Sequence, residues 1–168
     1  MIRFPKQITS EFFEYTYTGT IMDFKYKLEN LATKSKGFSV YPNLLIKLTS
    51  GSEFTVTNKF ELGTFKSNPF DTSTNIKGYY LKNSLNITQV NLLVTPHSMF
   101  PLLFFLLPIF FMTILFSDIS DTQKFLGFYP VTILAMLAIP IALLFISAFS
   151  KKRLLHRFVK YMDLNKIA

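Results

Sequence analysis

The chain has 168 residues, of which 49% are hydrophobic and 17% charged, and its formal net charge is +8. Its mean hydropathy of +0.30 is high for a water-soluble protein. The absence of cysteine excludes disulfides, thiolate metal sites and a cysteine nucleophile. Charged residues occur throughout residues 1–97 but are absent from 98–117 and from 125–150. This division predicts a small polar domain followed by a membrane-embedded part.

A strand and then a helix are predicted near the start of the chain. Aromatic side chains alternate along residues 12–18, which is the two-residue period of a strand. Apolar residues then recur at intervals of three and four, as on one face of a helix: Ile21, Phe24, Leu28 and Leu31. Thr20 and Asp23 have the spacing of an N-terminal capping box, and Gly37 follows the expected end of the helix.

Two β-hairpins are predicted after this helix, over residues 43–62 and 76–95. Four alternating apolar residues of the first hairpin are expected to pack against the helix: Phe54, Val56, Phe60 and Leu62. Thr57 is expected on the opposite, solvent-facing side. The order of elements predicts an α+β fold, a small antiparallel sheet with one covering helix, within a domain of residues 1–97.

Two transmembrane helices are predicted in residues 98–150, with spans at about 98–117 and 128–149. Each span supplies the roughly 20 residues that a hydrocarbon core about 30 Å thick requires. Pro101 and Pro130 fall near the starts of the spans, and Pro108 and Pro140 are expected to kink them. Neither span contains an ionisable residue, which argues against a transporter.

The basic tail, residues 151–168, is expected to set the orientation and to contact lipid. Apolar residues at helical spacing alternate there with cations, the pattern of a short helix in the headgroup layer. Five cations are predicted to contact lipid headgroups: Lys151, Lys152, Arg153, Arg157 and Lys160. Because cationic segments stay inside, both termini are expected in the cytoplasm, and the loop with Asp118 and Asp121 outside. No apolar signal segment occurs in residues 1–20.

Small residues at heptad-like spacing in the second span predict a helix-packing seam at Ala135, Ala138 and Ala142. Two uses of this seam are open. The first span, which has almost no small residues, could fill the seam within one chain. The seam could instead hold a second copy of the chain.

A resemblance adds to this interpretation. It rests on Gly78-Tyr-Tyr, a polar turn, the run Asn86 to Val94, and Pro96-His97 before a phenylalanine-rich hairpin. In these features the chain resembles small, functionally uncharacterised membrane proteins of Bacteroidota. The similarity covers about residues 50–150. It implies a compact cytoplasmic α+β domain in front of two spans at the bacterial inner membrane, and it brings no activity or functional residues.

No motif of catalysis is present. The sequence lacks phosphate-binding glycine loops and Gly-x-Ser-x-Gly, and His97 and His156 lack partners at metal-ligand spacing. We therefore predict no catalytic, cofactor-binding or metal residue, and no enzyme. The leading hypothesis is a membrane-anchored, non-enzymatic interaction or accessory module; the alternative is an oligomer-forming membrane effector or pore. Expected partners are the lipid bilayer and a membrane protein or second copy, with no nucleic acid.

Overall fold

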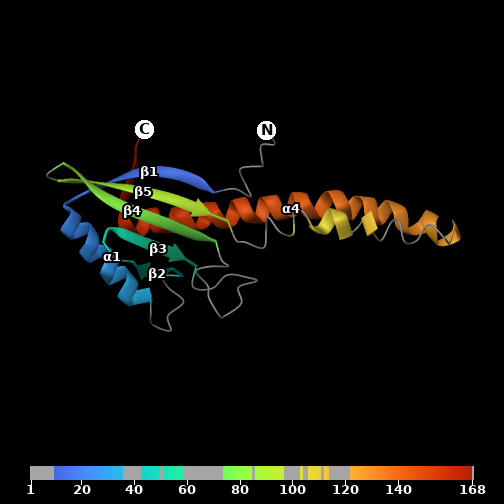
Figure 1. Cartoon of the computed structure of the whole chain (residues 1–168), viewed down its shortest axis with the longest axis horizontal. Coiled ribbons are helices and arrows are strands. Elements are labelled where there is room, and N and C mark those ends of the chain that lie inside the picture. The colour runs from blue at the N-terminus through green and yellow to red at the C-terminus, as the bar shows by residue number, and fades with distance from the viewer. Residues whose placement is uncertain are drawn as a thin grey trace.

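The computed structural model describes residues 10–35, 43–49, 51–58, 74–84, 86–96, 103, 106–110, 112–113 and 122–167. Within them, six strands form one antiparallel sheet, which confirms the α+β class (Figure 1). The strands are β1 (Glu11–Thr18), β2 (Leu45–Leu48), β3 (Glu53–Thr57), β4 (Asn75–Ser84), β5 (Ile87–Thr95) and β6 (Leu164–Lys166). Their order in the sheet is β2-β3-β4-β5-β1-β6. The long helices are α1 (Ile21–Ser35) and α4 (Thr122–Met162).

Strand β1 and helix α1 occur where the sequence predicts them. β1 pairs antiparallel with β5, with Tyr15 opposite Val90. The capping box forms at the start of α1. The Thr20 hydroxyl accepts a hydrogen bond from the Asp23 N–H at 3.2 Å, and the Asp23 carboxylate accepts one from the Thr20 N–H at 3.1 Å. Hydrogen bonds from Thr20 lower the pKa of Asp23, because they favour the ionised carboxylate.

Both predicted hairpins are confirmed within the described residues. β2 pairs with β3 around a turn at Gly51, whose φ of +80° is readily adopted by glycine. β4 pairs with β5, with a register shift between Lys82 and Ser84. Phe60 and Leu62, which were expected on the apolar face of the first hairpin, lie outside the described residues.

The core lies between one face of the sheet and the helices. Phe24 of α1 is fully buried, and its ring centroid lies 6.2 Å from that of Phe54 on β3 and 5.0 Å from that of Tyr80 on β4. The expected packing of the Phe24, Leu28 and Leu31 face of α1 against this sheet face is confirmed. Burial of each large side chain contributes about 1.5–3 kcal/mol.

Gly78 on β4 shows how closely the core is packed. A Cβ atom at this position would lie 2.2 Å from the Phe54 ring, which is itself buried. The absence of a side chain lets the aromatic ring lie directly on the strand backbone. A glycine inside a strand, which weakens most strands, is thus required here by its neighbour.

Thr57 does not face solvent, so that expectation is wrong. Its side chain is fully buried, and its hydroxyl donates a hydrogen bond to the Thr74 carbonyl oxygen at 3.0 Å. Asn58, Thr74 and Asn75 beside it are buried as well. Alternation along a strand shows which side chains share a face, and it does not show whether that face is covered.

Helix α4 is the largest departure from the expected architecture. It is one helix of 41 residues that includes the predicted second span and most of the predicted tail. It begins at Thr122, so Pro130 lies inside the helix and not near its start. The C-terminal part of α4 lies against the sheet, and the N-terminal part extends away from it (Figure 1). The sheet therefore has a second covering helix besides α1.

The apolar face of residues 151–168 is part of the core and does not lie on a surface, which corrects the expected headgroup-layer helix. Leu154, Phe158 and Met162 are fully buried. The ring centroid of Phe158 lies 5.4 Å from that of Phe54. The chain then turns at Asp163, whose φ is +52°, and β6 pairs with β1. Residues outside the predicted domain of 1–97 thus complete that domain.

The predicted spans are described in part. Of the first apolar run, the structure describes residues 103, 106–110 and 112–113, and the loop at 118–121 lies outside the described residues. The second run lies within α4, although the side chains of residues 122–133 and 135–137 are not described. Among the residues that the structure describes, no helix combines the length and the apolar character needed to cross a membrane.

We predict that Phe158→Ala destabilises the α+β domain by about 3–5 kcal/mol, because it removes a fully buried ring between α4 and the sheet. Tyr26→Ala on α1 is the control: its ring is 72% exposed, so we expect a change within about 0.5 kcal/mol. Urea unfolding of the full chain in mild detergent, followed by amide hydrogen exchange in β4 and β5, measures both. Equal effects would show that α4 does not stabilise the sheet.

Candidate functional site

The side chains predicted to contact lipid headgroups occupy two different environments on α4. Lys152, Arg153 and Lys160 are exposed, so they remain available to a lipid surface. Lys151 is only 5% exposed, and Arg157 is partly buried. The structure therefore places three of the five predicted residues at the surface and gives the other two partners inside the protein.

Lys151 forms an ion pair with β1. Its ammonium group donates a hydrogen bond to the Glu11 carboxylate, with 2.5 Å between Nζ and Oε1. The Glu11 side chain remains about one-third exposed, at 37%, so water still reaches one side of the pair. Because a buried ammonium without a nearby anion is costly, this pair favours one position of α4 along the sheet.

Further polar contacts join α4 to the same end of the sheet. The hydroxyl oxygens of Thr74 and Ser150 lie 3.1 Å apart, and Ser147 is fully buried. Arg157 donates a hydrogen bond to the Asn58 side-chain oxygen at 3.4 Å. Burial, followed by repulsion from Arg153, lowers the pKa of Arg157. The boundary between the sheet domain and the extending part of α4 is thus polar.

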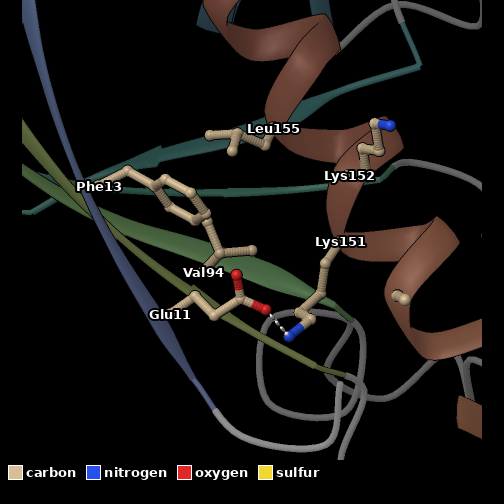
Figure 2. A pocket seen from close by; sticks show the side chains of 7 residues that line it. Glu11, Phe13, Val94, Lys151, Lys152 and Leu155 are labelled. Carbon is tan, nitrogen blue, oxygen red and sulfur yellow. Dashed lines mark hydrogen bonds and ion pairs between the residues drawn. The ribbon is translucent and has the colours of Figure 1, made fainter. Parts of the chain in front are cut away.

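A pocket of about 400 Å³ opens beside the Lys151–Glu11 pair, between α4 and the edge of the sheet (Figure 2). Its residues come from β1, β5 and one face of α4: Glu11, Phe13, Val94, Ala148, Lys151, Lys152 and Leu155. Among the described residues, β6 pairs with positions 15–17 of β1, and no strand pairs with that side of β1 at Glu11, where the pocket lies. The volume falls within the roughly 300–1,000 Å³ that is usual for small-molecule sites.

The predicted helix-packing seam lies on the exposed side of α4. Ala138 and Ala142 are exposed, and the side chain of Ala135 is outside the described residues. Residues 139, 140, 143 and 144 are the partly buried ones on this stretch of the helix. Packing of the first span into the seam is therefore not observed at Ala138 or Ala142.

Glu11, Phe13 and Val94 were missed as site residues, although the sequence carries a signal for Glu11. Alternation places Glu11 on the same strand face as Phe13, and helical spacing places Lys151 on the same face as Leu154 and Leu155. An acidic side chain on the apolar face of one element and a basic side chain on the apolar face of another are candidates for a buried ion pair. Val94 carries no such signal, because it resembles any other core residue of β5.

No metal site is found in the described part of the chain, where no group of three or more His, Cys, Asp or Glu could hold an ion. His156 is exposed on α4, and His97 lies outside the described residues. The lining of the pocket offers apolar contact and charge.

We predict that Glu11→Gln lowers the free energy of unfolding by about 1–3 kcal/mol, since it removes the anion beside a buried ammonium group. Glu14→Gln on the exposed face of the same strand should change it by less than about 0.5 kcal/mol. A double-mutant cycle with Lys151→Met should show coupling between positions 11 and 151. Additive effects in this cycle would mean that the ion pair does not form in solution.

Comparison with known proteins assigns no family. No protein-family model, no curated protein and no solved structure matches this chain.

Proposed function

We propose that this protein is a membrane-anchored, non-enzymatic interaction module of the bacterial inner membrane. In this proposal the apolar part of α4, together with residues 98–117, forms a transmembrane hairpin, and the α+β domain lies on the cytoplasmic side with both termini. The observation that carries the proposal is the two-part character of α4: one end packs in the sheet core, and the other presents large apolar side chains outward.

The exposed apolar side chains lie along the extending part of α4: Leu134, Ile141, Phe145, Ile146 and Phe149. A row of exposed large apolar residues on a helix is costly in water and favourable in hydrocarbon. No charged residue occurs between 125 and 150, and Lys151, Lys152 and Arg153 follow at once. This order of an apolar segment and then cations favours a cytoplasmic C-terminal side.

The continuity of α4 supports a role in which the domain is held at the membrane surface. A helix of 41 residues measures about 60 Å, which exceeds the thickness of a hydrocarbon core. The polar residues around Lys151 lie directly after the apolar segment, where the headgroups would be. A domain fixed in this way presents one defined surface to membrane proteins or lipids beside it.

Single-cysteine labelling tests the anchor, since the chain has no cysteine of its own. Phe145→Cys and Tyr26→Cys form a matched pair because both side chains are 72% exposed in the structure. In spheroplasts, a membrane-impermeant maleimide should label neither variant. After lysis it should label Tyr26→Cys alone, because the bilayer covers position 145 and position 26 faces the cytoplasm.

Phe145→Cys should react only after denaturation in detergent. Reaction at position 145 in native membranes, at the rate seen for position 26, would reject the anchor. Reaction at position 26 in sealed spheroplasts would instead show that the orientation is opposite to the proposed one, and it would not contradict the anchor.

A second candidate is an oligomer-forming membrane effector or pore, and the exposure of Ala138 and Ala142 favours it. Small residues four positions apart allow two helices to approach closely in a bilayer. We predict that Ala142→Cys forms a disulfide-linked dimer in native membranes under mild oxidation if the seam joins two copies. Ile139→Cys, on the partly buried side of the helix, is the control.

Equal cross-linking at positions 139 and 142 would reflect random collision and would argue against the seam. Cross-linking at 142 alone, together with loss of membrane potential on overexpression, would favour the pore over the interaction module.

A further inference from the structure

The pocket beside the Lys151–Glu11 pair has an apolar interior. Figure 2 shows the Phe13 ring and Val94 on the sheet side, with Leu155 of α4 across from the ring. Ala148 lines the pocket from the same helix face, and its methyl group leaves space that a larger side chain would occupy. These walls can contact hydrocarbon and offer it no hydrogen-bonding groups.

The charged residues of the pocket carry an excess of one positive charge. Glu11 and Lys151 balance each other through their ion pair. Lys152 is exposed on the next position of α4, and in Figure 2 its ammonium group lies apart from that pair. An anionic group at the entrance would therefore meet the Lys152 charge, while a cationic group would be repelled.

The position of the pocket along α4 indicates how a ligand would reach it. Ala148 lies between the exposed Phe145 and Phe149, directly before the cations that begin at Lys151. Leu155 lies two helical turns further into the domain. If the apolar part of α4 lies in the bilayer, the pocket opens at headgroup level. Lipids are the most abundant amphiphiles at that level, and their acyl chains begin directly below it.

We propose that this pocket binds an anionic amphiphile, with one acyl chain between Phe13, Val94 and Leu155 and the anionic head beside Lys152. The source of the ligand, a bilayer phospholipid such as phosphatidylglycerol, rests on the proposed membrane anchor. A free fatty acid offers the same chemistry, a single chain with a carboxylate, and does not require the anchor. The site gives the domain a means of responding to the lipid composition beside it.

The test uses the full chain in neutral detergent, titrated with fluorescently labelled phosphatidylglycerol. Ala148→Phe fills the pocket and should weaken binding by about tenfold or more, because the acyl chain loses its space. Ile146→Phe, on the exposed side of α4, is the matched control and should stay within about twofold of the unmodified chain. Unchanged binding by Ala148→Phe would overturn the proposal.

The charge contribution is tested separately, in case Ala148→Phe disturbs folding. Lys152→Glu should weaken binding by about tenfold at low salt and by less at high salt, because the contact is solvent-exposed. Lys160→Glu has the same change in net charge on an exposed part of α4 and should have little effect. Equal losses of lipid binding in the two variants would mean that the lipid is attracted to the basic surface in general, which would overturn the proposed site.

Competition identifies the source of the ligand. Displacement by unlabelled phosphatidylglycerol and not by oleate would support a bilayer lipid, and displacement by oleate would support a free fatty acid. If phosphatidylcholine displaced the labelled lipid as effectively as phosphatidylglycerol did, the requirement for an anion would be overturned. If oleate bound in the pocket and the maleimide also labelled position 145 in native membranes, the site would be retained and the membrane anchor rejected.

Discussion

Helix α4 imposes one mechanical constraint on the whole molecule. The chain remains helical from Thr122 to Met162, although Pro130 and Pro140 within α4 each lack the N–H that would complete a hydrogen bond of the helix. Its C-terminal part is held in the core by Leu154, Phe158 and Met162. Whatever surrounds the other end therefore determines how the sheet is oriented. Anchoring that end in a bilayer would restrict the orientations open to the domain.

The polar boundary on α4 adds specificity to this apolar packing. Hydrophobic faces tolerate sliding by one helical turn, because one leucine can replace another in a similar space. The Glu11–Lys151 ion pair and the Thr74–Ser150 contact do not tolerate such a slide, since it would place a buried charge against apolar side chains. We infer that the apolar residues provide most of the stability and that the polar ones select the register of the helix on the sheet. The pocket between α4 and β1 is formed at this same register.

The sequence predicted most of the local structure and little of the long-range assembly. Alternation and capping identified β1, α1 and both hairpins, because these signals depend on neighbouring residues. The amphipathic pattern after Lys151 was recognised, but such a pattern shows only that a helix has an apolar face; lipid or a protein core can cover it. β6 has three residues, Leu164–Lys166, too few for a detectable period. Glu11 became a site residue only through a partner 140 positions away.

The sheet is assembled from parts of the chain that are synthesised far apart in time. β1 to β5 precede the long apolar segments, whereas β6 and the buried face of α4 follow them. Until those last residues leave the ribosome, the inner face of the sheet lacks Leu154, Phe158 and Met162, and the edge of β1 has no β6 beside it. A nascent chain at that stage carries an uncovered apolar face and an unpaired strand edge, both of which promote association between chains. Completion of the domain therefore has to wait until both apolar segments have been synthesised, so the core closes only after those segments have left the ribosome.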